Sequence, residues 1–282
     1  MEQTTVLFEH LPGRVGLVTL NRPERLNALS PQVWQDITAV LHEADRDPEV
    51  RALVVRGAGR AFSAGADMDP SRPERDLLGW YESELESVPR HRVFREISKP
   101  TIGAIHGWCL GWGFELACSL DMLLASEDAK FGAPEIRHGS MVASILPLRI
   151  GPMWAKRLIF TGDIITAQKA REIGLVLDVF PDQGQVLEAA LALARRIALV
   201  PPLGVRFNKR MIDGVMEAVG GEMAVAYGSL VSAICHALME RAENTEGENL
   251  QAIRRNQGLK AFLEARERPF RPGPGKEPWV VQ

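Results

Sequence analysis

Strand-like and helix-like segments alternate closely in the first part of the chain, and this alternation limits the fold more than any other feature. Residues 15–20 form a short apolar run of β-favouring residues, and Asn21, Arg22 and Pro23 end it in a turn. Ser30 followed by Pro31 begins a helix whose apolar residues recur at spacings of three and four. Residues 51–56 then form a buried strand, so the sequence predicts an α/β layer architecture.

The organisation changes further along the chain. Residues 101–105 and 120–125 are further strand candidates, and the sequence after Pro201 and Pro202 is nearly all helical. We therefore expect an α/β core over residues 1–200 and a helical region over residues 201–282. The charged segment between residues 69 and 95 has two open interpretations: a flap or short helix over a pocket, or a solvated surface helix.

Composition excludes several classes of protein. The 282 residues carry a formal net charge of −3, which gives no electrostatic reason to bind nucleic acid or a membrane surface. The three cysteines are far apart, which argues against disulfides and a zinc site. The N-terminus lacks the pattern of a signal peptide, and the most membrane-like window, residues 101–126, is interrupted by charged residues. We expect a cytoplasmic protein with no nucleic-acid or membrane partner.

Two turns are unusually rich in small residues, at 56–67 and 106–117. Each follows a strand, where small residues let backbone N–H groups approach a ligand closely. The first turn fails the dinucleotide pattern because Phe62 stands where the third Gly is needed, and neither a P-loop nor a GxSxG motif occurs. Cys109, in the second turn, is expected to be a small buried residue. These turns are the candidate ligand-binding segments.

Two acids stand out beside these turns. Glu115 lies in the otherwise apolar run 112–116, where a carboxylate is costly unless it is paired or used. Glu135 follows another strand-like stretch and has few charged neighbours in sequence. Each alone is more often a structural residue, but together they form a candidate general acid/base pair. Spacing does not establish that they face each other.

The same segments carry a resemblance to a known family. The chain resembles the enoyl-CoA hydratase/isomerase (crotonase) superfamily along most of its length, in NRPERLNALS, ALVVRGAGRAFSAGADM, KPTIGAIHGWCLGWGFELACSLDMLLAS, AKFGAPEIRHG, IFTGDIITAQKAREIGLVLDVF and GLKAFLEARERPF. The resemblance implies an α/β spiral of ββα turns. It also implies a helical C-terminal region that mediates a homotrimer, which can pair into a dimer of trimers.

The resemblance also implies a chemistry. The backbone N–H groups of Ala66 and Trp112 would form an oxyanion hole for the enolate of an acyl-CoA thioester. Glu115 would activate water for attack at Cβ, and Glu135 would deliver a proton to Cα. Coenzyme A comes with the substrate, and no metal or redox cofactor is implied. The segments that match substrate- and CoA-binding positions supply Arg25, Leu26, Ala28, Ala64, Asp67, Met68 and Gly111.

Several positions depart from the family pattern. Trp112 replaces the middle Gly of a Gly-Gly-Gly run, the segment after Glu135 is shorter and contains His138, and Ala265 stands where a Lys commonly precedes Arg266. His138 is either a surface or supporting residue, or a group that assists an acid. The leading hypothesis is a 2-enoyl-CoA hydratase. The alternatives are an isomerase or hydrolase with the same oxyanion hole, or a catalytically silent acyl-CoA-binding or scaffold protein.

Overall fold

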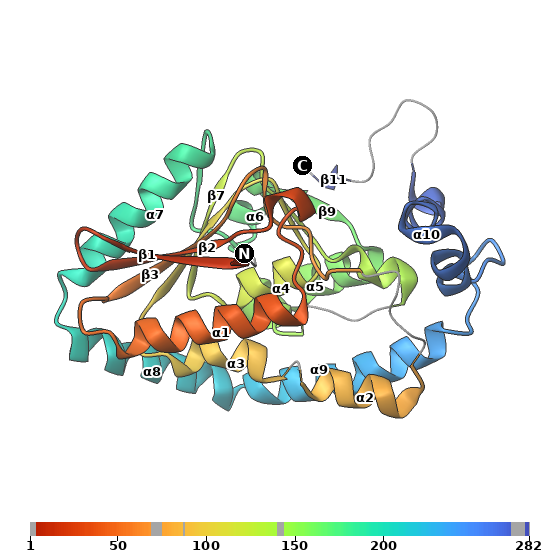
Figure 1. The fold of residues 1–282 in the computed structure, drawn as a ribbon, viewed down its shortest axis with the longest axis horizontal. Helices are drawn as coiled ribbons and strands as arrows, with labels where there is room; N and C mark the ends of the chain where they lie inside the picture. The colour runs from red at the N-terminus through yellow and green to blue at the C-terminus, as the bar shows by residue number, and fades with distance from the viewer. Residues whose placement is uncertain (1–3, 69–74, 87, 140–143, 272–279, 282) are drawn as a thin grey trace.

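The fold consists of two β-sheets with helices packed around them (Figure 1). The structure is a computed structural model and describes residues 4–68, 75–86, 88–139, 144–271 and 280–281. Within these residues the larger sheet has six strands in the order β1 (Val6–Leu11), β2 (Val15–Leu20), β3 (Ala52–Gly57), β5 (Thr101–Ile105), β7 (Met122–Ser126) and β10 (Asp178–Phe180). All pairs except β1–β2 are parallel, as strands joined by helical crossovers must be.

The second sheet is built from very short strands. Within the described residues its order is β11 (Val280–Val281), β9 (Ile164–Thr166), β8 (Lys130–Gly132), β6 (Trp108–Leu110) and β4 (Ala61–Ser63). The strands β3, β5 and β7 of the large sheet are each followed directly by a strand of this sheet and then by helix. The chain therefore advances as a spiral of ββα turns, which confirms the expected fold class.

The helices of the core follow the sequence pattern where it is strongest. α1 (Pro31–Arg46) begins at Ser30, whose side chain accepts a hydrogen bond from the Val33 N–H, and ends at the expected Asp47. The remaining core helices are α2 (Leu77–Leu85), α3 (Val88–Glu96), α4 (Trp112–Ser119), α5 (Leu146–Thr161), α6 (Ala167–Glu172) and α7 (Gln183–Ala198). The segment at 69–95 is thus helical from residue 77, while its first six residues lie outside the described ones.

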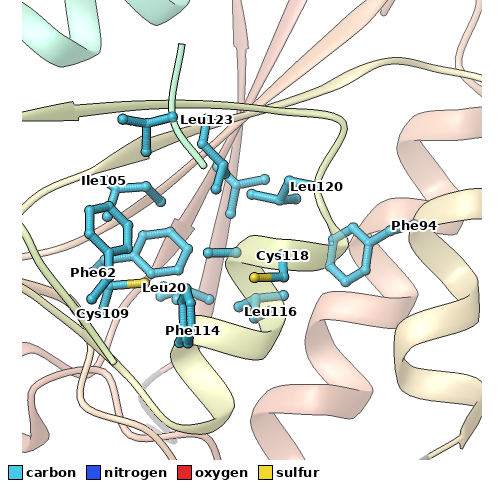
Figure 2. Close-up of a cluster of buried hydrophobic side chains, with 14 of the residues drawn as sticks. Leu20, Phe62, Phe94, Ile105, Cys109, Phe114, Leu116, Cys118, Leu120 and Leu123 are labelled. Atoms are coloured by element: carbon cyan, nitrogen blue, oxygen red, sulfur yellow. The ribbon is translucent and has the colours of Figure 1, made fainter. Parts of the chain in front are cut away.

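The core lies on both faces of the large sheet. On one face, α7 packs its buried Val186 and Ala190 against β2, β3 and β5. On the other face, side chains from both sheets meet α4, where Phe62, Cys109 and Phe114 lie together (Figure 2). Cys109 is fully buried, as expected for a small apolar side chain. This second core cluster holds β4, β6 and α4 in place, and those elements carry the two turns singled out in the sequence.

The C-terminal region is helical, as the sequence predicts, with α8 (Pro202–Ala218), α9 (Gly221–Met239) and α10 (Leu250–Glu267). α9 lies beside α2 along one side of the molecule, and α10 lies at one end (Figure 1). The Lys209 ammonium on α8 is buried and contacts Asp121 Oδ1 at 2.5 Å and the Phe94 carbonyl at 3.1 Å. The domain boundary near residue 200 stays a prediction.

The most membrane-like window of the sequence does not form one long helix. Residues 101–126 divide into β5, β6, α4 and β7, whereas α9 is the described helix that is long and apolar enough to cross a membrane by length and composition. One such helix is weak evidence for a membrane span. α9 is packed along α2, so we interpret it as part of the helical region.

Candidate active site

The first small-residue turn pairs with the segment after β2. The Ala64 N–H donates to the Leu26 carbonyl at 2.9 Å, and the Leu29 N–H donates to the Gly65 carbonyl at 2.8 Å. The Asp67 N–H then donates to the Leu29 carbonyl at 3.0 Å. This short parallel pairing brings residues 26–29 and 64–67 side by side, so most of the positions predicted to bind CoA share one edge.

Asn27 holds this pairing in place. Its buried amide donates to the carbonyls of Ala58 and Ala61 at 2.9 and 2.8 Å, and its Oδ1 accepts from the Arg22 N–H at 2.9 Å. Its φ of 54° lies in the left-handed region, which Asn tolerates better than most residues. Sequence reasoning did not single out Asn27, although it lies in the matched segment NRPERLNALS.

Asp67 is paired with two arginines. Its carboxylate accepts from Arg22 at 2.8 Å and from Arg25 at 3.1 Å, and Arg22 also donates to the Ala28 carbonyl at 2.8 Å. Despite the cost of burial, the hydrogen bonds from Arg22 and Arg25 keep the pKa of Asp67 below its ordinary value. The family resemblance predicts that Arg25 and Asp67 bind CoA. In the structure these two side chains contact each other, and the Arg25 side chain is about half exposed.

The second turn leads directly into α4. Gly111 has a φ of 53° and its N–H donates to the Gly132 carbonyl at 3.0 Å, which ties the start of α4 to β8. A Cβ on Gly113 would lie 2.6 Å from Ser63 Cβ, so only glycine lets α4 approach β4 this closely. The two small-residue turns, about fifty residues apart in sequence, therefore meet at Ser63 and Gly113.

The two predicted oxyanion-hole residues lie on these adjoining turns. Ala66 pairs with Leu29 as an isolated parallel bridge, so its own N–H points to the side opposite the 26–29 segment. Trp112 is the first residue of α4, where N–H groups have no acceptor within the helix. No hydrogen bond joins either N–H to another described residue. Both are thus donors open to a ligand, at the positive end of a helix dipole in the case of Trp112.

Glu135 lies directly over this junction. It belongs to the 3₁₀ helix η2 (Pro134–His138), which follows β8. A Cβ on Gly111 would lie 2.6 Å from the Glu135 carboxyl carbon, and a Cβ on Gly65 would lie 3.6 Å from Glu135 Oε1. The absence of a side chain at Gly111 therefore makes room for this carboxyl group, whereas the distance at Gly65 is an ordinary contact.

Burial changes the acidity of Glu135. Its Oε2 is buried and has no hydrogen-bond partner among the described residues. Burial, with a smaller contribution from the charge of Glu115, raises the pKa of Glu135 to about 7, although Arg266 acts in the opposite direction. Glu115, half-buried on α4, thus lies close enough to act on Glu135. A carboxyl group that exchanges its proton near neutral pH is suited to acid/base catalysis.

Two of the positions that depart from the family pattern, Trp112 and His138, lie near these acids in sequence. The half-buried Trp112 ring packs against the core, and the Arg90 guanidinium lies 5.6 Å from its centre. The His138 ring packs edge-on against Phe262 of α10 at 5.2 Å, and its Nδ1 is buried. His138 is therefore half-buried, with its Nδ1 turned into the protein. Met68 and Ala265 lie in a separate apolar cluster with Phe262.

The remaining side chains that the structure describes form no centre of another kind. Among the described residues, no group of three His, Cys, Asp or Glu side chains is placed to hold a metal ion. Burial raises the pKa of Cys109 and Cys118, which is unfavourable for a reactive thiolate. The acids and the backbone donors around Gly111 therefore form the best-supported candidate site.

Comparison with known proteins agrees with this geometry. The enoyl-CoA hydratase/isomerase family model matches residues 11–272. The chain is 33% identical to the (E)-benzylidenesuccinyl-CoA hydratase of Thauera aromatica, over 92% of this chain and 96% of that protein. It is also 33% identical to the 2,3-dehydroadipyl-CoA hydratase of Escherichia coli K12, over 92% and 95% of the two chains.

A solved structure leads to the same result. The enoyl-CoA hydratase/isomerase of Xanthobacter autotrophicus Py2 superposes with a TM-score of 0.86 at 33% identity, covering 95% of this chain and 99% of that one. The protein belongs to the enoyl-CoA hydratase/isomerase family, whose members act on acyl-CoA thioesters.

Proposed function

We propose that this protein is an enoyl-CoA hydratase, which adds water reversibly across the 2,3 double bond of an enoyl-CoA thioester. The observation that carries the proposal is the convergence of Glu135, Glu115 and two open backbone donors around Gly111. Relatives at 33% identity over almost the whole chain are named as hydratases of enoyl-CoA esters, which supports the same reaction here.

The thioester carbonyl would bind between the N–H groups of Ala66 and Trp112. When water adds at Cβ, negative charge collects on the thioester oxygen. Two fixed donors stabilise that charge, and the loss of one such donor typically costs about 3–4 kcal/mol in the barrier. The tight contact of Gly113 with Ser63 fixes the spacing between the two turns, so the donors need no rearrangement during the reaction.

The two acids divide the proton transfers. Glu115 accepts a proton from water as the water oxygen bonds to Cβ, and Glu135 gives its proton to Cα. The product is a 3-hydroxyacyl-CoA, and both acids return to their starting state by exchange of one proton with solvent. The raised pKa of Glu135 supports its part, because an acid near pH 7 is still protonated where an ordinary carboxyl group is not.

Substrate binding is proposed along the edge formed by residues 25–28 and 64–68. The exposed Arg25 can reach a CoA phosphate from this edge, while Leu26, Ala28, Ala64 and Met68 offer small or apolar contacts to the pantetheine chain. The proposed reaction is acid/base chemistry, in which coenzyme A is part of the substrate and no metal or redox cofactor takes part.

The test is hydration of crotonyl-CoA and longer enoyl-CoA esters, followed as the loss of enoyl thioester absorbance. Glu115→Gln and Glu135→Gln are each expected to reduce turnover by about 10²–10⁴-fold, as is typical for a general acid or base. Glu127→Gln is the matched control, because Glu127 is an exposed acid in the turn between β7 and β8. Unchanged turnover in both site variants would refute the proposal.

A second reaction is tested in the same assay. The family includes isomerases, which move a double bond by transferring a proton without adding water. A Glu115→Gln enzyme that still converts a 3-enoyl-CoA into a 2-enoyl-CoA at the wild-type rate would identify the protein as an isomerase that uses Glu135 alone.

The assembly proposed for this enzyme is a homotrimer, which can pair into a dimer of trimers. α8 and α9 expose a set of large apolar side chains that a monomer would leave in water: Leu203, Phe207, Met211, Ile212, Val215, Val219, Met223, Tyr227, Leu230, Ile234 and Leu238. Copies of this chain that cover this surface would also account for the membrane-like composition of α9. The enzyme is proposed to act in the cytoplasm, with no nucleic-acid or membrane partner.

A further inference from the structure

His138 shares a face of η2 with Glu135. In a 3₁₀ helix, side chains three residues apart eclipse one another, and the rise is about 2 Å per residue. His138 therefore follows Glu135 on the same side of η2, about 6 Å further along its axis. The charge of Arg266 acts on both side chains, which supports this shared orientation.

The His138 side chain is half-buried, and its Nδ1 is a buried polar atom without a hydrogen-bond partner among the described residues. One edge of the ring packs against Phe262. Trp80 on α2 shows the same feature, since its Nε1 is also buried without a described partner and its ring stacks on His236 at 4.3 Å. Buried polar groups are normally hydrogen-bonded, so His138 Nδ1, three residues after Glu135, is a position where a ligand can form a hydrogen bond.

The surroundings of His138 favour negative charge. Burial, together with the positive charges of Arg266, His236 and Arg254, holds the pKa of His138 well below its usual range, so the ring is neutral. Glu267 is the nearby acid on α10, but both Arg137 and Arg266 share its carboxylate. On α9, His236 Nδ1 lies 3.6 Å from Glu84 Oε1 of α2. Arg266 thus brings positive charge close to His138, which favours an anionic ligand there.

We infer that His138 recognises a carboxylate at the far end of the acyl group, which makes this protein selective for enoyl-CoA esters of dicarboxylic acids. This inference rests on the proposed hydratase function and names its substrate class. In an extended chain, four carbon–carbon bonds beyond Cα span about 5 Å, because bonds of about 1.5 Å meet at tetrahedral angles, and a hydrogen bond covers the rest of the separation of about 6 Å. The neutral ring donates one N–H to the carboxylate, and the surrounding arginines stabilise its charge.

The experiment compares two substrates of equal length, 2-hexenoyl-CoA and 2-hexenedioyl-CoA, which differ only in a carboxylate at carbon 6. Wild-type enzyme is expected to show at least about tenfold higher kcat/KM for the dicarboxylic ester, mainly through KM, as one charge-assisted hydrogen bond allows. His138→Leu is expected to bring the ratio of the two values close to one. His138→Asn, which keeps an N–H donor, restores part of the preference. His42→Leu, on α1, is the control that retains the wild-type ratio.

Each other result has a definite meaning. Equal kcat/KM values for the two esters in wild-type enzyme would overturn the inference and leave the hydratase function intact. A preference that survives in His138→Leu would assign recognition of the carboxylate to another group and overturn the role of His138. Hydration of neither ester, nor of crotonyl-CoA, would overturn the proposed function itself. Because the readout is a ratio of two substrates, general damage to the fold does not imitate the expected result.

Discussion

Around Ser63 and Gly111 the chain packs so tightly that an added Cβ would collide with its neighbours, whereas α8 and α9 leave large apolar side chains in solvent. The first region is completed by its own chain through backbone pairing, Asn27 and close glycine contacts. The second exposes apolar surface of an extent that is normally covered, which supports the proposed assembly. The proposed catalytic geometry and the proposed assembly therefore depend on different parts of the molecule, and each can be changed separately.

The largest effect is expected from Gly111→Ala. A new Cβ would fall against the Glu135 carboxyl group, and residue 111 would have to keep a φ of 53°. Hydration is expected to fall about 100-fold or more, because the acid is displaced from the oxyanion-hole turn. Activity on crotonyl-CoA and the melting temperature should be measured together.

Gly174→Ala is the matched control for this substitution. Gly174 also has a positive φ, of 80°, but nothing lies within 4 Å of an added Cβ. Gly174→Ala therefore shows the effect of backbone strain alone, which lowers the free energy of unfolding by about 1–2 kcal/mol. Wild-type activity in Gly111→Ala would mean that the close contact of Glu135 with Gly111 is not needed for catalysis.

The second effect is a loss of activity at alkaline pH. Because burial raises the pKa of Glu135 to about 7, its proton is retained well above the ordinary value of 4.5 and is lost as pH rises through about 7. Since the protonated form donates to Cα, kcat/KM for hydration should fall about tenfold per unit above that pH. Dehydration needs the same single proton on the pair, held by Glu115 instead of Glu135, so its kcat/KM should fall over the same range. The two profiles run in parallel because addition of water takes up no net proton, and its equilibrium constant does not change with pH.

The measurement is the pH profile of kcat/KM in both directions, with the melting temperature recorded at each pH. An activity that stays level well above pH 7, with the fold intact, would contradict the assignment of Glu135 as the proton donor. A parallel fall in both directions at a constant melting temperature would support the assignment, because loss of structure would lower the melting temperature as well.

The elements that the sequence predicts are those that local periodicity and capping determine. Residues 15–20 and 101–105 and helix α1 follow from local periodicity and capping, and they form as expected. Three-residue strands such as β4 and β6 are too short to show a period, so the residue pattern did not predict them, and the ββα spiral was expected only from the family resemblance.

The same limit applies to the site. Glu115 and Glu135 were selected because a carboxylate in an apolar segment is costly, which is a local property. Their proximity, and the pairing of Arg22 with Asp67 across 45 positions, depend on how the two turns meet. Asn27 was missed for the same reason, since Ala58 and Ala61, which accept its hydrogen bonds, lie 31 and 34 positions away.

The third effect is on stability. Asn27→Ala removes two buried hydrogen bonds to the Ala58 and Ala61 carbonyls and places alanine at a φ of 54°. The free energy of unfolding is expected to fall by about 2–4 kcal/mol, measured by chemical denaturation. Asn208→Ala is the control, because Asn208 is exposed and donates within α8 to Gly204. Equal losses in the two variants would contradict the view that Asn27 holds the first turn.

The smallest change in the stability of a single chain is expected from a substitution on the exposed face of α8. Phe207 is 64% exposed, so Phe207→Glu should change the stability of a single chain by no more than about 0.5 kcal/mol. The same change should disrupt assembly, because a charge buried between copies has no partner there. Sedimentation should show a smaller particle for Phe207→Glu, while Ala39→Glu, on the exposed face of α1, should leave the mass unchanged. An unaltered mass for Phe207→Glu would mean that copies of this chain do not cover this face of α8. The packing around Gly111 would be unaffected by that result, because it is formed within one chain.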